Sequence, residues 1–316
     1  MFNRSEYDRI IVHADRSMEI LVIGSSNTDM VVRAPRLPVA GETILGGQFR
    51  MVPGGKGANQ AVAVVRLGGS VRFVAKLGDD LFGRQTLAGL REENIPGDYI
   101  SIDPEFPSGV ALITVDERGE NSIVVAGGAN TRLTETDIDR SLPALESAEI
   151  ILLQLEIPLQ TVEYAARLAR EFGKTVILDP APACPLPDSL LQTVTILTPN
   201  QTEAELLTGI AVNSPETARK AAIELRARGV ANVIITLGSE GAYLYNGEID
   251  RRIPGFPVEA VDTTAAGDTF NGALAVALAE GKDLVTAIAF AHRAASIAVT
   301  RPGARSSIPY RREIAF

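Results

Sequence analysis

The stretch with the clearest chemical potential reads Asp262-Thr-Thr-Ala-Ala-Gly-Asp-Thr-Phe-Asn-Gly272, and it opens a long apolar segment that predicts a helix. Small residues at Ala265, Ala266 and Gly267 let backbone N–H groups crowd together at the helix start, which is partly positive and attracts anions. Asp268 falls in the first turn. A carboxylate there is either an ordinary helix cap or, beside an anion site, the base that orients a hydroxyl for phosphoryl transfer. We expect the helix start to favour its charged form, which would make Asp268 a weak base.

A second motif, Gly54-Gly-Lys-Gly-Ala-Asn-Gln60, predicts a glycine-rich entry into another helix. Its glycines permit close backbone approach to a ligand. Lys56 and Asn59 lie three apart, hence on one helix face, where they could bind adjacent hydroxyls. A solvated helix start without a ligand is the alternative. Upstream, Asn27 and Asp29 follow an apolar strand and alternate by two, which suits a polyol but is equally compatible with a plain turn.

Weaker candidates follow other predicted strands. Asn200 and Glu203 share the face of a short helix and could hold Mg²⁺ through its waters, although capping of that helix explains them as well. The polar loop Thr236–Gly241 follows a strand and could contact a nucleotide. Glu156 ends another strand and could face the same cleft. A helical histidine such as His292 more often packs than reacts.

The elements that must position these residues alternate between short apolar strands and helices. Strands are predicted at 19–24, 71–77, 149–155, 175–178, 194–197 and 233–237, and helices at 54–67, 81–93, 159–172, 202–207, 214–229, 267–280 and 283–299. Such alternation predicts an α/β fold of three layers, with a mostly parallel sheet flanked by helices. Residues 242–253 predict a hairpin around Asn246-Gly247.

Two segments contain only β patterns, and we expect them to pair as a small β-sheet lid over the carboxyl ends of the main strands. The predicted division is an extension at 1–17, an α/β catalytic domain of 18–29, 53–107 and 128–316, and a lid of 30–52 and 108–127. The extension is polar, lacks the apolar centre of a secretion signal and is expected to be dispensable.

Composition narrows the classes of function. The 316 residues are 46% hydrophobic and carry a net charge of −9, which argues against a nucleic-acid partner or an anionic membrane surface. One cysteine excludes an internal disulfide framework and fits a reducing compartment, so the expected location is the cytoplasm. Both the Walker pattern and the G-x-G-x-x-G fingerprint are absent.

From about Met18 to Arg312 the chain resembles the ribokinase (PfkB-type) family of carbohydrate kinases. The specific signatures are Gly54-Gly-Lys-Gly-Ala-Asn-Gln-Ala61 and Asp262–Ala273, supported by Gly24–Asp29, Gln154–Glu156, Pro180–Ala183 and Thr198–Glu205. The similarity is greatest to the members that phosphorylate D-ribose. It implies ATP-dependent transfer to the 5-hydroxyl, giving D-ribose 5-phosphate. Asp179 is a departure, because the comparable family members often carry Asn there.

The resemblance also implies a set of site residues. Asp268 is expected to be the base, with Ala265, Ala266 and Gly267 as the anion hole. The sugar is expected to contact Asn27, Asp29, Gly55, Lys56, Gly57, Asn59, Val125 and Glu156. ATP is expected to contact Asn200, Thr236, Leu237, Gly238, Ser239, Glu240, Gly241, Gly267 and His292, with Glu203 placing Mg²⁺ through water. Potassium is expected at Asp262, Thr264, Ala298, Arg301, Gly303 and Ser307, where it would stabilise the charged loop. A homodimer formed through the lid sheets is also expected.

Other functions stay open on the sequence alone. The nearest is a sister kinase for deoxyribose, fructose, 2-keto-3-deoxygluconate or a nucleoside, because the glycine-rich motif is widely shared. A non-catalytic sugar-binding regulator is less consistent with an intact Asp268. A nicotinamide oxidoreductase is remote, since no glycine fingerprint follows Gly24.

Overall fold

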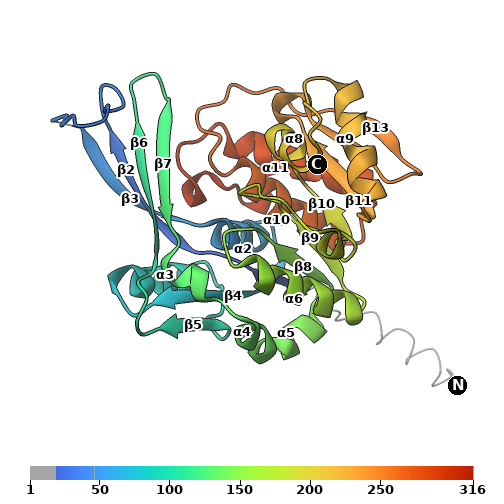
Figure 1. The fold of residues 1–316 in the computed structure, drawn as a ribbon, viewed down its shortest axis with the longest axis horizontal. Coiled ribbons are helices and arrows are strands. Elements are labelled where there is room, and N and C mark those ends of the chain that lie inside the picture. The colour runs from blue at the N-terminus through green and yellow to red at the C-terminus, as the bar shows by residue number, and fades with distance from the viewer. Residues whose placement is uncertain (1–18, 46, 316) are drawn as a thin grey trace, which may run out of the picture.

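A nine-stranded sheet forms the centre of the computed structural model, which describes residues 19–45 and 47–315 (Figure 1). The predicted extension at 1–17 lies outside these residues. The strand order is β13-β12-β11-β10-β9-β8-β1-β4-β5. The bounds are β1 (Glu19–Ile23), β4 (Ser70–Gly78), β5 (Ile100–Asp103), β8 (Ile150–Leu153), β9 (Thr175–Leu178), β10 (Ile196–Leu197), β11 (Asn232–Thr236), β12 (Ala242–Tyr245) and β13 (Asp250–Ile253). The strands from β11 to β5 are parallel, whereas β12 and β13 add an antiparallel edge.

The sheet is buried on both faces, which explains its apolar strands. In β1, Ile20 and Val22 belong to one hydrophobic cluster, and Leu21 and Ile23 to the other. The first cluster contains residues of α2 (Lys56–Arg66), α3 (Leu81–Glu92), α10 (Ala266–Ala279) and α11 (Leu284–Ala298). The second contains residues of α4 (Glu135–Arg140), α5 (Leu142–Ser147), α6 (Leu159–Glu171), α7 (Asp188–Leu191), α8 (Gln201–Thr208) and α9 (Pro215–Ala227). The predicted three-layer α/β fold is thus confirmed.

The two β-only segments pair into a separate four-stranded sheet that stands to one side of the main body (Figure 1). Its order is β3 (Gln48–Gly54), β2 (Asn27–Arg33), β6 (Gly109–Val115) and β7 (Asn121–Ala126). Strands β2 and β6 are parallel, and the other two pairs are antiparallel. We call it the small sheet. Strand β2 begins four residues after β1 ends, and β3 ends two residues before α2 begins, so the small sheet is directly connected to the core.

Short elements escaped sequence reasoning. Neither β5 nor α4, α5 and α7 was predicted, because segments of four to six residues show too little periodicity. The strand expected at 194–197 is reduced to Ile196–Leu197, and that expected at 149–155 ends at Leu153. Among the described residues, no helix is long and apolar enough to cross a membrane.

Candidate active site

Asp268 lies in the first turn of α10 but does not cap it. Its carboxylate points across to α2, where Asn59 Nδ2 donates to Oδ2 at 2.9 Å and Gln60 Nε2 donates to Oδ1 at 3.2 Å. The side chain is buried, at 4% exposure, and Ala265 occupies the N-cap position without a side-chain cap. The capping interpretation of this carboxylate is therefore wrong, because its hydrogen bonds go to another helix.

The acidity of Asp268 differs from our expectation. Burial raises the pKa of its carboxyl above the ordinary value, although Lys56 and the amides of Asn59 and Gln60 oppose the change. The prediction that the helix start would leave a weak base was wrong. The sequence revealed the helix start but not the complete burial, which is the dominant effect.

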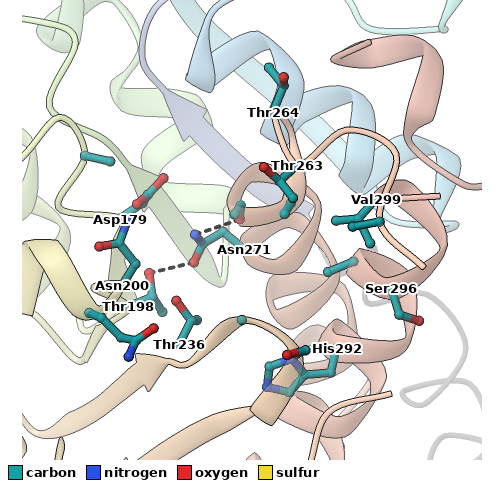
Figure 2. A pocket seen from close by; sticks show the side chains of 18 of the residues that line it. Asp179, Thr198, Asn200, Thr236, Thr263, Thr264, Asn271, His292, Ser296 and Val299 are labelled. Carbon is teal, nitrogen blue, oxygen red and sulfur yellow. Dashed lines mark hydrogen bonds between the residues drawn. The ribbon is translucent and has the colours of Figure 1, made fainter. Parts of the chain in front are cut away.

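The start of α10 offers backbone donors, as predicted, but not all of them are equivalent. The N–H of Ala266 donates to Thr263 O at 3.1 Å, whereas the N–H groups of Gly267 and Asp268 have no backbone acceptor within the described ranges. Asn271 stabilises this turn through two hydrogen bonds. Its Nδ2 donates to Gly267 O at 3.0 Å, and its Oδ1 accepts from Thr198 Oγ1 at 2.8 Å (Figure 2).

A buried amide joins two carboxyl groups beneath this turn. Gln60 Nε2 also donates to Asp179 Oδ2 at 2.8 Å, and Gln60 Oε1 accepts from Gln154 Nε2 at 2.6 Å. Burial raises the pKa of Asp179 to about 8, with further increases from Asp268 and Glu203, while Lys56 opposes them. Burial would lower the pKa of Lys56, but the surrounding carboxylates outweigh it and raise that pKa, so Lys56 stays charged.

The predicted sugar contacts other than Val125 lie where β1 and β8 end and β2 and α2 begin. Glu156 Oε2 accepts from the backbone N–H of Lys56 at 3.1 Å and from the hydroxyl of Ser25. Asn27 Oδ1 accepts from Asn130 Nδ2 at 2.7 Å, which fixes the orientation of the Asn27 amide. Asn130 was missed, since it follows the hairpin in a stretch without a motif.

Asp29 lies against Gly54 in the neighbouring strand of the small sheet. A Cβ on Gly54 would fall 2.3 Å from both carboxylate oxygens, and one on Gly109 would fall 2.2 Å from Asn27 Oδ1. The backbone must therefore be bare at both places. Burial, Glu156 and Asp268 raise the pKa of Asp29 to about 6, while Arg305 opposes them.

A cavity of about 490 Å³ lies beside the start of α10 (Figure 2). It is bordered by Lys56 and Asp179, by Asn200 and Glu203 of the α8 start, and by the Ala266–Gly267 turn. Its far wall is apolar and contains Phe256, Val258, Ala295 and Val299, with His292 beside them. The shape and lining suit a nucleotide, with its base at the apolar wall and its phosphates near the α10 start.

His292 lies in that wall with its ring centroid 5.0 Å from that of Phe270. Burial lowers its pKa to about 4, so the imidazole is neutral at physiological pH. Its Nε2 is buried without a hydrogen-bond partner in the described part of the chain. A neutral ring with an unpartnered nitrogen can exchange a hydrogen bond with a heterocyclic base.

Asn200 and Glu203 form a capping box. Asn200 Oδ1 accepts from the backbone N–H of Glu203 at 2.9 Å, and Glu203 Oε2 accepts from that of Asn200 at 2.8 Å. The capping alternative is thus correct, but it does not exclude a ligand, because both residues also border the cavity. Burial raises the pKa of Glu203, partly offset by hydrogen bonding with Asn200.

The expected nucleotide loop is divided by the structure. Thr236, Gly238 and Ser239 border the cavity, whereas Leu237, Glu240 and Gly241 do not. Glu240 instead pairs with Arg252 at 3.3 Å, and Gly241 has a φ of 101° and packs against Ile253 O.

The predicted potassium ligands lie in two adjoining segments, residues 262–264 and 298–307. Asp262 Oδ1 accepts from the N–H and hydroxyl of Thr264 at 3.0 and 2.5 Å, and Oδ2 accepts from the N–H of Gly303 at 2.8 Å. Burial alone would raise the pKa of Asp262, but these hydrogen bonds hold it below its usual value. The N–H of Arg301 donates to Ala298 O at 3.0 Å, while its guanidinium pairs with Glu313. Ser307 Oγ donates to Ala304 O at 2.7 Å.

A second cavity, of about 480 Å³, lies between these loops and the inner face of the small sheet. The inner face carries Asp29, Val52, Ile113 and Ile123, and the register places Val125 on the same face, half exposed. The two cavities share Ala260, Thr263 and Thr264, immediately before α10. No cluster of three or more His, Cys, Asp or Glu side chains arranged to hold a metal occurs among residues 19–45 and 47–315.

The two cavities meet at the loop before α10, and Gly267, next to the buried Asp268, lines the first of them; this arrangement is suited to group transfer on an α/β scaffold. The chain belongs to the pfkB family of carbohydrate kinases, whose sequence profile matches residues 17–311.

Individual relatives cover nearly the whole chain. A ribokinase of Haemophilus influenzae is 44% identical over 93% of this chain and 96% of its own. A deoxyribokinase of Salmonella typhimurium is 39% identical over 92% and 96%. The structure of Arabidopsis thaliana ribokinase complexed with ribose and ATP matches with a TM-score of 0.86 and 36% identity, covering 94% of this chain and 97% of that one.

Proposed function

We propose that this kinase transfers the terminal phosphoryl group of ATP to the 5-hydroxyl of D-ribose, giving D-ribose 5-phosphate. The observation that carries the proposal is the meeting of the two cavities at the loop that leads into α10, whose first turn holds the buried Asp268. The similarity to ribokinases supports ribose as the sugar. Polar groups with fixed orientations, Asn27, Asp29, Asn59 and Glu156, provide donors and acceptors for its hydroxyls.

Asp268 would orient the sugar hydroxyl and accept its proton. Its raised pKa makes it a better acceptor than an exposed aspartate, because base strength increases with pKa. The N–H groups of Gly267 and Asp268 would stabilise charge on the moving phosphoryl, and that of Ala266 would join them on leaving Thr263 O. Lys56, which the sequence predicted as a sugar contact, borders the nucleotide cavity and not the second cavity, so it would hold a phosphate oxygen instead.

Mg²⁺ and K⁺ are proposed as bound ions. Glu203 borders the nucleotide cavity with Asn200, and a lone carboxylate with an amide suits Mg²⁺, which keeps most of its waters. Magnesium would neutralise phosphate charge. The Asp262 carboxylate and carbonyls of the adjoining loops would supply the oxygen ligands for potassium. The expected reducing, cytoplasmic location remains part of the proposal and is supported by the single cysteine.

The small sheet is proposed to act as a lid and as a dimer interface. Its outer face exposes Val32, Phe49, Met51, Leu112 and Val124, which alternate with the inner residues along each strand. Such an apolar face favours burial against a second copy. Val124→Asp should shift the protein to a monomer by sedimentation, and an unchanged dimer or a monomeric wild type would contradict the interface.

A coupled ADP-release assay tests the reaction. We expect ribose to give the highest kcat/KM, and ADP release to require the sugar. Deoxyribose is the competing acceptor, since a deoxyribokinase is among the relatives, and fructose, 2-keto-3-deoxygluconate and nucleosides complete the panel. A higher kcat/KM for another acceptor would replace ribose in the proposal, and no sugar-dependent release would reject the reaction.

A further inference from the structure

Arg305 is a buried cation that the proposed reaction does not use. It lies in the single-turn 3₁₀ helix Arg305–Ser307, beyond the loop of Gly303, and is 7% exposed. Its Nη2 donates to Gly54 O at 3.0 Å and approaches Ser26 Oγ at 3.5 Å. Its Nε has no hydrogen-bond partner within the described residues. A buried charge with an unsatisfied donor is expensive to maintain unless an opposite charge compensates it.

Asp29 supplies the larger part of that opposite charge from beside Gly54. Its carboxylate lies against Gly54, since a Cβ on that glycine would fall 2.3 Å from both oxygens, and the carbonyl of Gly54 accepts from Arg305. The carboxylates of Glu156, after β8, and Asp268, on α10, repel Asp29, and Arg305 is the cation that opposes them. Burial lowers the pKa of Arg305 to about 10, and the carboxylates of Asp29 and Glu93 oppose that change.

We propose that Arg305 is a positioning residue for the sugar site, holding Asp29 ionised and fixing Gly54 against it. This inference rests on the proposed function. An ionised carboxylate accepts hydrogen bonds from two hydroxyls, and such charge-assisted bonds are about twice as strong as neutral ones. Arg305 would thereby set sugar affinity without touching the sugar.

The first test is Arg305→Gln, which removes the charge. Without the cation, burial and the neighbouring carboxylates raise the pKa of Asp29 further, so more of it is protonated at pH 7. We expect KM for the sugar to rise on the order of tenfold at pH 7, by analogy with the loss of one charged hydrogen bond. The acid limb of kcat/KM should move to higher pH, while kcat and the KM for ATP change little. Arg305→Lys, which keeps the charge, should leave the acid limb near its wild-type position.

Arg66→Gln is the matched control. Arg66 Nη1 donates to the carbonyls of Arg305 and Ile308 at 2.6 and 2.9 Å, and its Nη2 pairs with Glu93 at 2.5 Å. Its loss should loosen the same segment and lower the unfolding midpoint, yet leave the acid limb in place. An equal shift in both variants, or none in Arg305→Gln, would overturn the inference. In an Asp29→Asn background, Arg305→Gln should raise KM no further.

The wild-type protein provides a test that needs no variant to fold. Sugar affinity measured by titration calorimetry should hold at neutral pH and fall only below about pH 6, the value for Asp29. If sugar affinity is already lost at pH 7, the inference about Arg305 is overturned but the proposed function is not. A wild type that phosphorylates no sugar would instead reject the proposed function and this inference with it, so the two failures are distinguishable.

Discussion

Asp179 and Asp268 share one hydrogen-bond donor, Gln60 Nε2, at 2.8 and 3.2 Å. Both carboxyls are buried, and the negative charge of Asp268 disfavours ionisation of Asp179. Lys56 attracts both. Burial therefore raises the pKa of both carboxyls, that of Asp179 to about 8, while Lys56 opposes the change in each.

Asp179→Asn should stabilise the ligand-free protein at alkaline pH. The folded-state pKa of Asp179 is raised from 3.8 to about 8, so its contribution to stability is full below pH 4 and is lost as pH rises through 8. At pH 9 the variant, which cannot ionise, should unfold a few degrees above wild type, at roughly 2–4 °C per kcal/mol. The two midpoints should converge only as pH falls toward 4, near the ordinary pKa of the carboxyl. Thermal unfolding across pH checks this, and a wild-type midpoint that stays level with the variant at pH 9 would contradict the assigned proton.

Asp268→Asn should lower turnover by about three orders of magnitude, because a positioned general base contributes roughly 10²–10⁴. Sugar binding should persist, since the amide keeps the size and can still accept from Asn59. The measurements are kcat by ADP release and sugar affinity by calorimetry. Asp283→Asn is the control, because Asp283 caps α11 through Val285 and Thr286 and should leave kcat unchanged. Turnover within tenfold of wild type would remove Asp268 from the reaction.

Gly54→Ala should weaken sugar binding without unfolding the protein. Its added Cβ must displace the Asp29 carboxylate, while its backbone needs no left-handed conformation. We expect the sugar KM to rise about tenfold, the value of one charge-assisted contact, with an unchanged KM for ATP. Gly89→Ala in α3, where a Cβ meets no atom within 4 Å, should leave both KM values alone. Equal effects on ribose and ATP would show that the substitution disturbs more than Asp29.

Replacing potassium by tetramethylammonium should lower kcat. A cation at the Asp262 loops would steady the turn that leads into α10, and the larger ion cannot enter an oxygen-lined site of that kind. Steady-state rates at constant ionic strength provide the measurement. In Asp262→Asn the difference between the two salts should disappear. Identical wild-type rates in both salts would argue against the cation site.

The sequence predicted the functional motifs, but it did not predict which distant residues form hydrogen bonds with them. The strand–helix alternation predicted the fold, and the glycine-rich stretches marked both helix starts, because such patterns are local. Gln60 stood inside a recognised motif, yet only tertiary structure reveals that its nitrogen joins two carboxyls. Asn130 and Arg305 lie in short 3₁₀ helices far along the chain from the groups they contact, 103 residues from Asn27 and 251 from Gly54. Burial of Asp268, which reversed the expected direction of its pKa, was likewise invisible.

Close packing at the connection from β1 to β2 limits where substitutions could change the preference for the sugar acceptor. A Cβ on Gly24 would fall 1.9 Å from Gln154 Oε1, and one on Gly57 would fall 2.7 Å from the Gly24 backbone. Neither glycine can therefore be replaced by a residue with a side chain without displacing its neighbours. Variation is better directed to Val52, Ile113 and Ile123, which border open volume on the small sheet. Libraries built there can reshape the entrance for other sugars while the reacting groups keep their alignment.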